Sequence, residues 1–474
     1  MEVIVKLILI LILIGVVSCT TQKIEKGGKE MKRDLKTDIM DNQNILSKSE
    51  KLYGLSKFWQ EVNYNFIYLD KVNREEWNNE YKKLLLEVQE TKNDYEYYRL
   101  LKKFCALLKD GHTNIYYPKR INENITKNSF DGYKLFFKNI DGRVIITKAI
   151  SEKDEIPIGS EVIEVNNLKV WDYINKNVIP YIASSTDYIL IDFGARDLLK
   201  APIGTHFNVT IKLPSGEFKK LTLINSKNSL IDNDKSLPVL ELKWLKNDIA
   251  YLALNSFISS NIVDEFQKVL PELYKAKKLI IDLRENGGGN SNYAVDIIKY
   301  FIKENEMIFS KQVTRLHMPV FKAWGKNVKK EDIDKDDWYK KAYFSYRDQY
   351  YYTFPIYKIK IKDDIKKIIV PTVVLIGHDT ASSSEDLLIL ASKEKHFTKI
   401  GEPTFGSTGQ PFMFDLVGGA KSRVCAKKDT YPDGTEFVGY GIQPDIKVKK
   451  TFKDYLEKKD PVLEKAVKYL DNIK

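Results

Sequence analysis

The apolar positions of the chain change their spacing along its length, and each spacing predicts a different kind of structure. In residues 46–125 they recur three and four residues apart, the spacing of one helix face. Two series show it: Trp77, Tyr81, Leu84, Leu85 and Val88, then Tyr97, Leu100, Leu101, Phe104 and Leu108. Gly111 is a natural helix stop after the second series. The pattern predicts a small N-terminal helical bundle.

Residues 126–230 show the two-residue alternation of half-buried strands instead. Residues 157–166 lead from a turn into alternation, and residues 207–213 alternate again before a turn at 214–216. The two ends of this block, "IPIGSEVIEVNN" and "GTHFNVTIKLPSGEFKKLTL", resemble those of a PDZ domain. A PDZ domain binds an extended peptide end as an added strand. An unrelated β-sandwich or barrel is the alternative.

Strands and helices alternate through residues 231–474, which predicts an α/β core. Apolar runs place strands at 249–254, 279–283 and 368–377, and helices at 263–276, 293–302 and 385–393. Residues 306–365 interrupt this order and are rich in Tyr, Trp and Lys. We interpret them as an inserted excursion, for which a lid is one role.

The N-terminus carries a targeting signal. Residues 7–17 are an unbroken apolar run behind Lys6, too short for an ordinary transmembrane helix but suited to a signal peptide. The run ends at Ser18-Cys19, which resembles a bacterial lipobox. That resemblance implies a signal peptide over residues 1–18, a lipidated Cys19, a polar tether over 19–45 and a place in the cell envelope. A plain membrane anchor with an incidental cysteine is the alternative.

Composition narrows the function classes. Lys and Arg number 76 against 65 Asp and Glu, a net charge of +11, and the two signs are interspersed, which argues against nucleic-acid binding. Hydrophobic residues make up 43% of the chain, so a fully disordered chain is excluded. Its three cysteines form no CxxC pair and no Cys/His cluster, which excludes a disulfide scaffold and argues against a zinc site.

A glycine-rich turn is the first motif with chemical potential. The buried strand in "IIDLRENGGGN" (residues 280–290) runs directly into Gly287, Gly288 and Gly289. Glycines allow backbone N–H groups to point at a ligand, which is what an oxyanion hole needs. A flexible strand-to-helix turn is the alternative, and the lack of a following Lys-Ser/Thr pair excludes a Walker phosphate loop.

A serine cluster and a histidine supply a candidate nucleophile and base. In "GHDTASSSED" (residues 377–386), Ser382 and Glu385 have the spacing of a helix capping box. A serine at a helix N-terminus also lies near free N–H groups and the positive end of the helix dipole. His112, one of five histidines, is the candidate general base because imidazole titrates near neutrality. A surface or capping role is the alternative for it.

Taken in order, these segments resemble one family. "DGHT", the PDZ-like block, "LIIDLRENGGG", "TASSSED", "GEPTFGSTGQP" and "YPDGTEFVGYGIQPDI" resemble the C-terminal processing (tail-specific) and tricorn-type serine peptidases. The resemblance implies a multidomain α/β protein with a Clp-protease/crotonase-like core, a protein or peptide substrate and no cofactor. It implies Ser382 as nucleophile and an oxyanion hole formed by the amides of Gly288, or less directly Gly289, and Ser383.

The resemblance also bears on the base. Tail-processing members use the lysine of a "TFGK"-like motif, but this chain has Ser407 there, which argues against a Ser/Lys dyad. The tricorn-like branch uses a histidine, which implies His112. Its orienting glutamate aligns with Val438 here; Glu436, two residues earlier, is the candidate in its place and Asp433 the runner-up.

The sequence therefore predicts an envelope-anchored serine endopeptidase that works through an acyl-enzyme. A catalytically inactive peptide- or ligand-binding member of the same fold is the main alternative. A surface-anchored PDZ adaptor and a crotonase-type acyl-CoA enzyme are further ones, and an exported lipoprotein would meet little coenzyme A. Substrate preference and oligomeric state are left open by the sequence.

Overall fold

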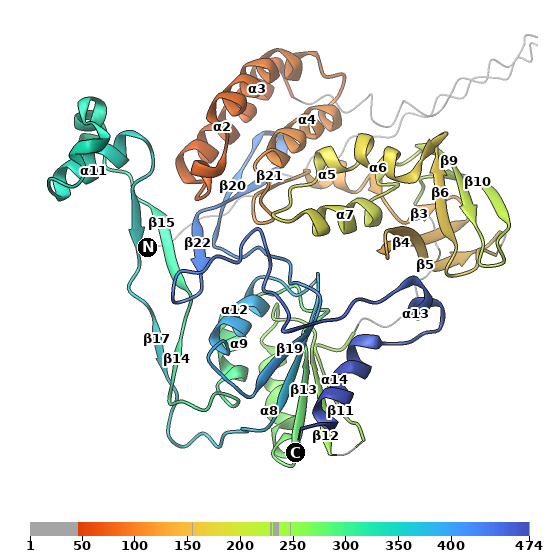
Figure 1. The fold of residues 1–474 in the computed structure, drawn as a ribbon. Coiled ribbons are helices and arrows are strands. Elements are labelled where there is room, and N and C mark those ends of the chain that lie inside the picture. Colours follow the sequence, from red (N-terminus) through yellow and green to blue (C-terminus); the bar gives the residue numbers. More distant parts are fainter. Residues whose placement is uncertain (1–45, 154, 228–229, 231–236, 247, 474) are drawn as a thin grey trace, which may run out of the picture.

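The computed structural model describes residues 46–473 except 154, 228–229, 231–236 and 247 (Figure 1). The predicted signal peptide, Cys19 and the tether lie outside the described residues. Within the described part of the chain, no helix is long and apolar enough to cross a bilayer.

The N-terminal helices are α2 (Lys48–Asn65), α3 (Arg74–Glu87) and α4 (Asp94–Ala106). The side chains of Ser47, Asn73 and Asn93 accept a hydrogen bond from the first turn of each helix in turn. Their apolar faces meet around Trp77, whose ring stacks on Phe104 with centroids 3.8 Å apart. The helical spacing read from the sequence is confirmed here.

A seven-stranded antiparallel sheet follows, with its own apolar core. Along the sheet the strands are β10 (Phe218–Ile224), β9 (His206–Lys212), β6 (Glu161–Val165), β5 (Arg143–Ser151), β4 (Tyr133–Ile140) and β3 (Ser129–Phe130), and β7 (Leu168–Lys169) pairs with β6. Helices α6 (Val170–Asn177) and α7 (Asp187–Arg196) come between β7 and β9 and lie toward the helical bundle (Figure 1). We call residues 126–230 the β-rich domain.

The third part is built on a six-stranded sheet. Its strands, in spatial order, are β11 (Leu240–Trp244), β12 (Ile249–Leu254), β13 (Lys278–Asp282), β18 (Thr372–Ile376), β19 (Phe397–Gly401) and β23 (Ile446–Lys447). All neighbours are parallel except β11 and β12. The helices are α8 (Asn261–Leu273), α9 (Ser291–Ile298), α12 (Ser383–Leu390) and α14 (Pro461–Asp471). The predicted α/β alternation is confirmed.

Neighbouring strands of this sheet bring two of the motifs together. Because β13 and β18 are adjacent and parallel, the loops that follow them leave the same edge of the sheet. The loop after β13 is the glycine-rich turn, and the loop after β18 carries Ser382. Apolar side chains fill both faces of these strands, and α14 packs over the face that carries Ile280 and Val373.

A small sheet brings the third motif to this edge. Strand β1 (Asn114–Tyr116), which begins two residues after His112, pairs with β21 (Lys421–Cys425), and β21 pairs with β20 (Pro411–Asp415). The sheet therefore ties the end of the helical bundle to the C-terminal third of the chain.

The excursion at 306–365 is folded. Strand β14 (Glu306–Ile308) pairs with β17 (Lys358–Lys360), while β15 (Lys311–Arg315) pairs with β16 (Tyr351–Thr353) and β22 (Lys427–Thr430). These strands carry α10 (Pro319–Trp324) and α11 (Asp337–Tyr346), which project away from the six-stranded sheet (Figure 1). A lid role for the excursion stays a prediction.

Candidate active site

The turn between β18 and α12 holds Ser382 in an uncommon conformation. Ser382 is the N-cap of α12, with φ 56° and ψ −119°, a left-handed region that costs a non-glycine residue free energy. Two hydrogen bonds brace the turn: Thr380 N–H donates to Gly377 O at 2.9 Å, and Ala381 N–H donates to Asn286 O at 3.1 Å. Such a conformation persists only where its surroundings enforce it, and it is typical of functional sites.

The glycine-rich turn packs directly against Ser382. A Cβ atom on Gly288, at φ 94°, would lie 2.7 Å from Ser382 Cβ. A Cβ on Gly289, at φ 144°, would lie 2.0 Å from the carbonyl oxygen of Phe257. No larger residue fits at either position without moving the backbone, so the glycines are required for this close approach.

The backbone amides around Ser382 are not equivalent. Gly288 N–H donates to Asn286 Oδ1 at 3.0 Å, so this predicted oxyanion donor is already engaged. Ser383 is the first residue of α12, and its N–H has no acceptor within the helix. Gly289 N–H makes no hydrogen bond to any of the described residues. Ser383 and Gly289 are therefore the predicted donors whose N–H groups form no hydrogen bond among the described residues.

A buried carboxyl group, Glu385, joins the serine turn to residues 404–407, which we call the "TFGS" segment. Its Oε2 accepts from Ser382 N–H at 3.1 Å, and its Oε1 accepts from Thr404 Oγ1 at 2.6 Å and Gly406 N–H at 2.8 Å. Burial raises its pKa to about 8 against the opposing effect of these hydrogen bonds. Through these three hydrogen bonds the carboxyl group fixes the two segments side by side.

His112 also contacts the "TFGS" segment, at Ser407. Its Nδ1 lies 2.6 Å from the hydroxyl oxygen of Ser407. Gly111 permits this approach, because a Cβ there would lie 2.7 Å from the ring of Phe405 and 3.1 Å from Ser407 Oγ. Arg423 donates to the carbonyl oxygen of Gly111 at 3.1 Å and holds the loop from the β21 side.

The surroundings of His112 favour a neutral ring. Burial lowers its pKa to about 4, and the positive charges of Arg423 and Lys427 contribute in the same direction. When Nδ1–H donates to Ser407 Oγ, Nε2 carries the lone pair and can accept a proton. The ring therefore has the protonation state of a general base at neutral pH.

A continuous set of contacts links the candidate nucleophile and base. Ser382 bonds to Glu385, Glu385 bonds to Gly406, and the next residue, Ser407, bonds to His112. No direct hydrogen bond joins Ser382 to His112 among the described residues. Catalytic hydrogen bonds often tighten only when substrate is bound, so this separation does not exclude the pair.

Among the described residues, neither candidate orienting acid forms a hydrogen bond with His112. The carboxylate of Glu436 bonds to Lys71 at 3.1 Å and also to Lys428. Asp433 is exposed and accepts from Thr435 N–H in its own turn at 2.9 Å. Lysines hold the Glu436 oxygens, and the side chain on His112 Nδ1 is Ser407, so Glu436 as the orienting acid stays a prediction.

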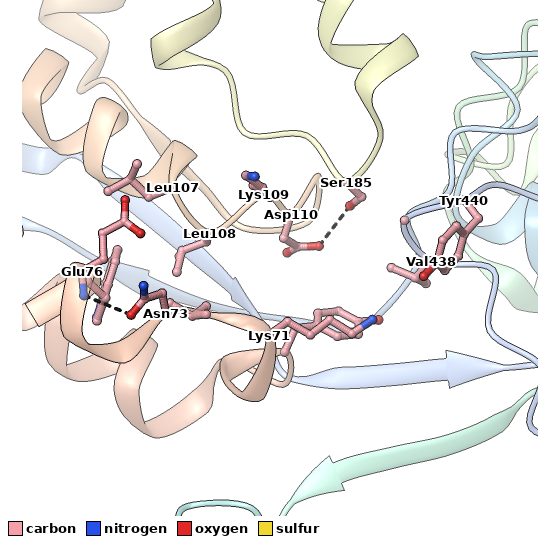
Figure 2. Close-up of a pocket in the computed structure, with 14 residues that line it drawn as sticks. Lys71, Asn73, Glu76, Leu107, Leu108, Lys109, Asp110, Ser185, Val438 and Tyr440 are labelled. Carbon is pink, nitrogen blue, oxygen red and sulfur yellow. Dashed lines mark hydrogen bonds between the residues drawn. The ribbon is translucent and has the colours of Figure 1, made fainter.

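A cavity of about 470 Å³ lies beside the His112 loop (Figure 2). Asp110, two residues before His112, forms part of its wall, and Ser185 Oγ donates to Asp110 Oδ1 at 3.4 Å. Val438 lines the opposite side, and the next residue, Gly439, donates its N–H to Gly406 O at 2.8 Å. The cavity therefore adjoins both segments that hold His112.

Sequence reasoning missed two polar partners. The side-chain oxygen of Asn286 accepts from Gly288 N–H, and its carbonyl oxygen accepts from Ala381 N–H, so Asn286 links the two turns. An Asn before a run of glycines is a known turn signal. His378, four residues before Ser382, pairs with Asp192 of α7 at 2.5 Å. The partner of His378 comes from 186 residues away, and no local pattern announces it.

Comparison with known proteins also indicates a peptidase. Residues 248–448 match Peptidase family S41. The carboxy-terminal processing protease CtpA of Bacillus subtilis (strain 168) is 23% identical over 420 residues, covering 86% of this chain and 72% of that protein. CtpB of the same organism is 24% identical over 211 residues, covering 44% of this chain and 36% of that protein.

The match to chloroplastic carboxyl-terminal-processing peptidase 2 of Arabidopsis thaliana likewise spans only 46% of that protein, at 23% identity over 58% of this chain. In fold, the chain is similar to the crystal structure of mature CPAF. The TM-score is 0.60 at 14% identity, over 90% of this chain and 96% of that chain.

The matched region and the curated relatives define a serine-type peptidase, and its fold is a multidomain α/β one. Residues 248–448 carry the region of peptidase family S41, and the relatives named above are carboxy-terminal processing proteases.

Proposed function

We propose that this chain is a serine endopeptidase that cleaves peptide bonds through an acyl-enzyme on Ser382, with His112 as the general base. The main support is the contact path from the strained Ser382 turn through Glu385 and Gly406 to the Ser407–His112 pair. No metal or organic cofactor enters this mechanism.

The proposed reaction has two halves. His112 Nε2 takes the proton of Ser382 Oγ while the oxygen attacks the carbonyl carbon of the scissile bond. His112 then gives that proton to the leaving amine, and the C–N bond breaks to leave an ester on Ser382. In the second half, water attacks the ester, and His112 takes the water proton and returns it to Ser382 Oγ. The acid is released and the site is restored.

The negative charge of the tetrahedral intermediate needs backbone donors. Ser383 N–H and Gly289 N–H form no hydrogen bond among the described residues, whereas Gly288 N–H can serve only if it leaves the side chain of Asn286. Each such donor contributes about 2.7–4 kcal/mol to transition-state stabilisation. We therefore propose Ser383 and Gly289 as the first donors, with Gly288 as the alternative.

A serine in place of the lysine favours the histidine as base. The hydroxyl of Ser407 is small enough to let the His112 ring approach to 2.6 Å, and it leaves the ring uncharged. A lysine ammonium at this position would compete with the ring for the same space. We infer a Ser/His site, with Ser407 in place of an orienting carboxylate.

The proposed substrate is a protein or peptide. The cavity beside Asp110 is a suitable subsite because it opens next to the two segments that hold His112 (Figure 2). The PDZ-like character of the β-rich domain would add a place for a peptide end. Residues 1–19 would anchor the enzyme in the cell envelope through a lipid on Cys19.

Cleavage of casein by the full chain, purified in detergent, tests the function. Ser382→Ala and His112→Ala are both expected to lose cleavage, while Ser215→Ala, at an exposed turn, keeps it. Cleavage that survives in Ser382→Ala contradicts the nucleophile. If the wild-type chain cleaves neither casein nor other unfolded proteins, the peptide-binding alternative replaces the peptidase.

Lipidation has its own test. Cys19→Ser should lose metabolic labelling by a fatty acid and should leave the membrane fraction. Labelling that persists in this variant contradicts a lipid on Cys19.

A further inference from the structure

One short segment of the β-rich domain, residues 184–193, contacts three segments of the candidate active site: the His112 loop, residues 404–407 and the turn before Ser382. At the His112 loop, Gly111 N–H donates to Ser185 Oγ at 2.9 Å, and Ser185 Oγ reaches Asp110 Oδ1 at 3.4 Å. This contact fixes the loop next to the cavity wall (Figure 2).

The same segment also contacts residues 404–407, the loop that carries Ser407. Tyr188 Oη donates to Thr404 O at 2.5 Å, and the ring of Phe193 lies 5.7 Å from that of Phe405. Thr186 fills the space beside Gly406, where a Cβ would lie 2.8 Å from Thr186 Cγ2.

The third contact is an ion pair on the nucleophile turn. Asp192 Oδ2 lies 2.5 Å from Nδ1 of His378, and the other oxygen of Asp192 accepts from Asn139 Nδ2 at 2.7 Å. The Tyr188 ring stacks on the His378 ring with centroids 4.5 Å apart and planes at 27°. Both members of the pair are about three-quarters buried, at 24% and 25% exposed.

The position of His378 makes this pair relevant to the nucleophile. His378 lies inside the turn from Gly377 to Thr380, directly before the strained Ser382. On the core side the turn is braced by Thr380 Oγ1, which donates to Leu283 O at 2.9 Å. Asp192, which belongs to the β-rich domain, contacts the same turn through His378. The backbone of Ser382 needs such bracing from more than one direction.

We propose that Asp192 is a positioning residue: it holds His378 from the β-rich domain and thereby fixes the turn that presents Ser382. The proposal rests on the peptidase function proposed above. Asp192 touches neither substrate nor reacting atoms, so its effect should appear in turnover more than in substrate binding.

The charge around His378 sets a pH limit on this contact. Burial opposes a charged ring, but the hydrogen bond and charge of Asp192, with the charges of Glu402 and Asp379, outweigh it and raise the pKa of His378. Lys447 and Lys449 face Glu402 and moderate its charge. The ion pair is therefore complete below the raised pKa and is lost as pH rises through it.

The test compares Asp192→Asn with Asp187→Asn in the full chain. Asp187 is exposed on the first turn of the same helix and serves as the matched control. We expect Asp192→Asn to lower kcat by about ten- to a hundredfold with little change in KM, since small misplacements have costs of this size. Its alkaline activity limb should move to lower pH. Asp192→Glu should recover part of the loss, and Asp187→Asn should match the wild type.

Amide exchange of residues 377–382 gives a readout that does not depend on activity. These amides should exchange faster in Asp192→Asn and in His378→Gln, and the double variant should be no worse than either single variant. Unchanged exchange in both single variants overturns the proposal, as does a loss of kcat without faster exchange. If the wild-type chain has no peptidase activity, the exchange result alone decides whether Asp192 fixes the turn.

Discussion

Two histidines stand near Ser382, and their surroundings are opposite. His112 has a hydroxyl on Nδ1 and two cations nearby, Arg423 and Lys427, and its pKa is lowered to about 4. His378 has a carboxylate on Nδ1 and further carboxylates nearby, and its pKa is raised. The surroundings of the first ring favour its neutral form, which can accept a proton, whereas those of the second favour its charged form, which can pair with Asp192.

The comparison indicates that the role of a histidine depends on the group that its ring contacts. Its separation from the serine along the chain matters less. His378 is only four residues from Ser382, yet its Nδ1 is paired with the carboxylate of Asp192 and donates to it when the ring is charged. His112 is far away in sequence, yet it is the ring that we propose as the base.

The largest expected effect separates the two rings directly. His112→Ala should lower kcat/KM by at least about a thousandfold, close to the effect of Ser382→Ala, because base and nucleophile act as a unit. His378→Ala should lose less, since it removes a support and not the base. Steady-state kinetics on an unfolded protein substrate measures all three. Equal losses of kcat/KM in His112→Ala and His378→Ala would contradict the assignment of different roles to the two rings.

Ser407→Ala comes next in size. It leaves the His112 ring without its 2.6 Å partner, and we expect kcat to fall by about ten- to a hundredfold, within the range of general-base catalysis. Ser422→Ala is the matched control, because Ser422 is also buried and donates to Asn114 O at 3.0 Å. Wild-type kcat in Ser407→Ala would show that His112 needs no orienting group.

The pH profile sharpens the comparison further. A base whose pKa is lowered to about 4 stays neutral down to mild acid, so kcat/KM should be constant from about pH 7 to 5 and half-lost near pH 4. At the alkaline side, activity should decline as His378 loses its proton above its ordinary range. An acid limb centred near pH 6.5 would mean that the base is an exposed imidazole and not buried His112.

The smallest effect is expected at Glu436. It is 37% exposed and paired with Lys71 and Lys428, and such surface ion pairs contribute about 0–1 kcal/mol. Glu436→Gln should therefore change kcat by no more than roughly twofold. A loss as large as that of Ser407→Ala would restore Glu436 as the acid that orients His112.

Much of the fold follows from local pattern. The strand Ile249–Leu254 is predicted to its ends because a run of buried apolar residues between turn signals has few other solutions. Helices α3 and α4 follow from apolar residues on one face and asparagine caps. Ser382 and the glycine turn were predicted as neighbours of a helix end, and their close approach follows from adjacent parallel strands.

The rest of the site depends on contacts between distant segments. Ser407 and His112 are 295 residues apart, and only the folded chain shows that a serine hydroxyl meets the ring. Glu436 seemed a suitable acid because it lies near the expected alignment position, but nearby lysines bind it. The engagement of Gly288 N–H by Asn286 was signalled only weakly, by an Asn ahead of glycines.

The most direct measurement is intact-mass analysis of the full chain after treatment with a serine-directed fluorophosphonate. The account predicts one adduct, located on Ser382, absent from Ser382→Ala and formed at least about a hundredfold more slowly in His112→Ala. An adduct that persists in Ser382→Ala, or labelling of His112→Ala at the wild-type rate, would contradict a nucleophile at Ser382 activated by His112.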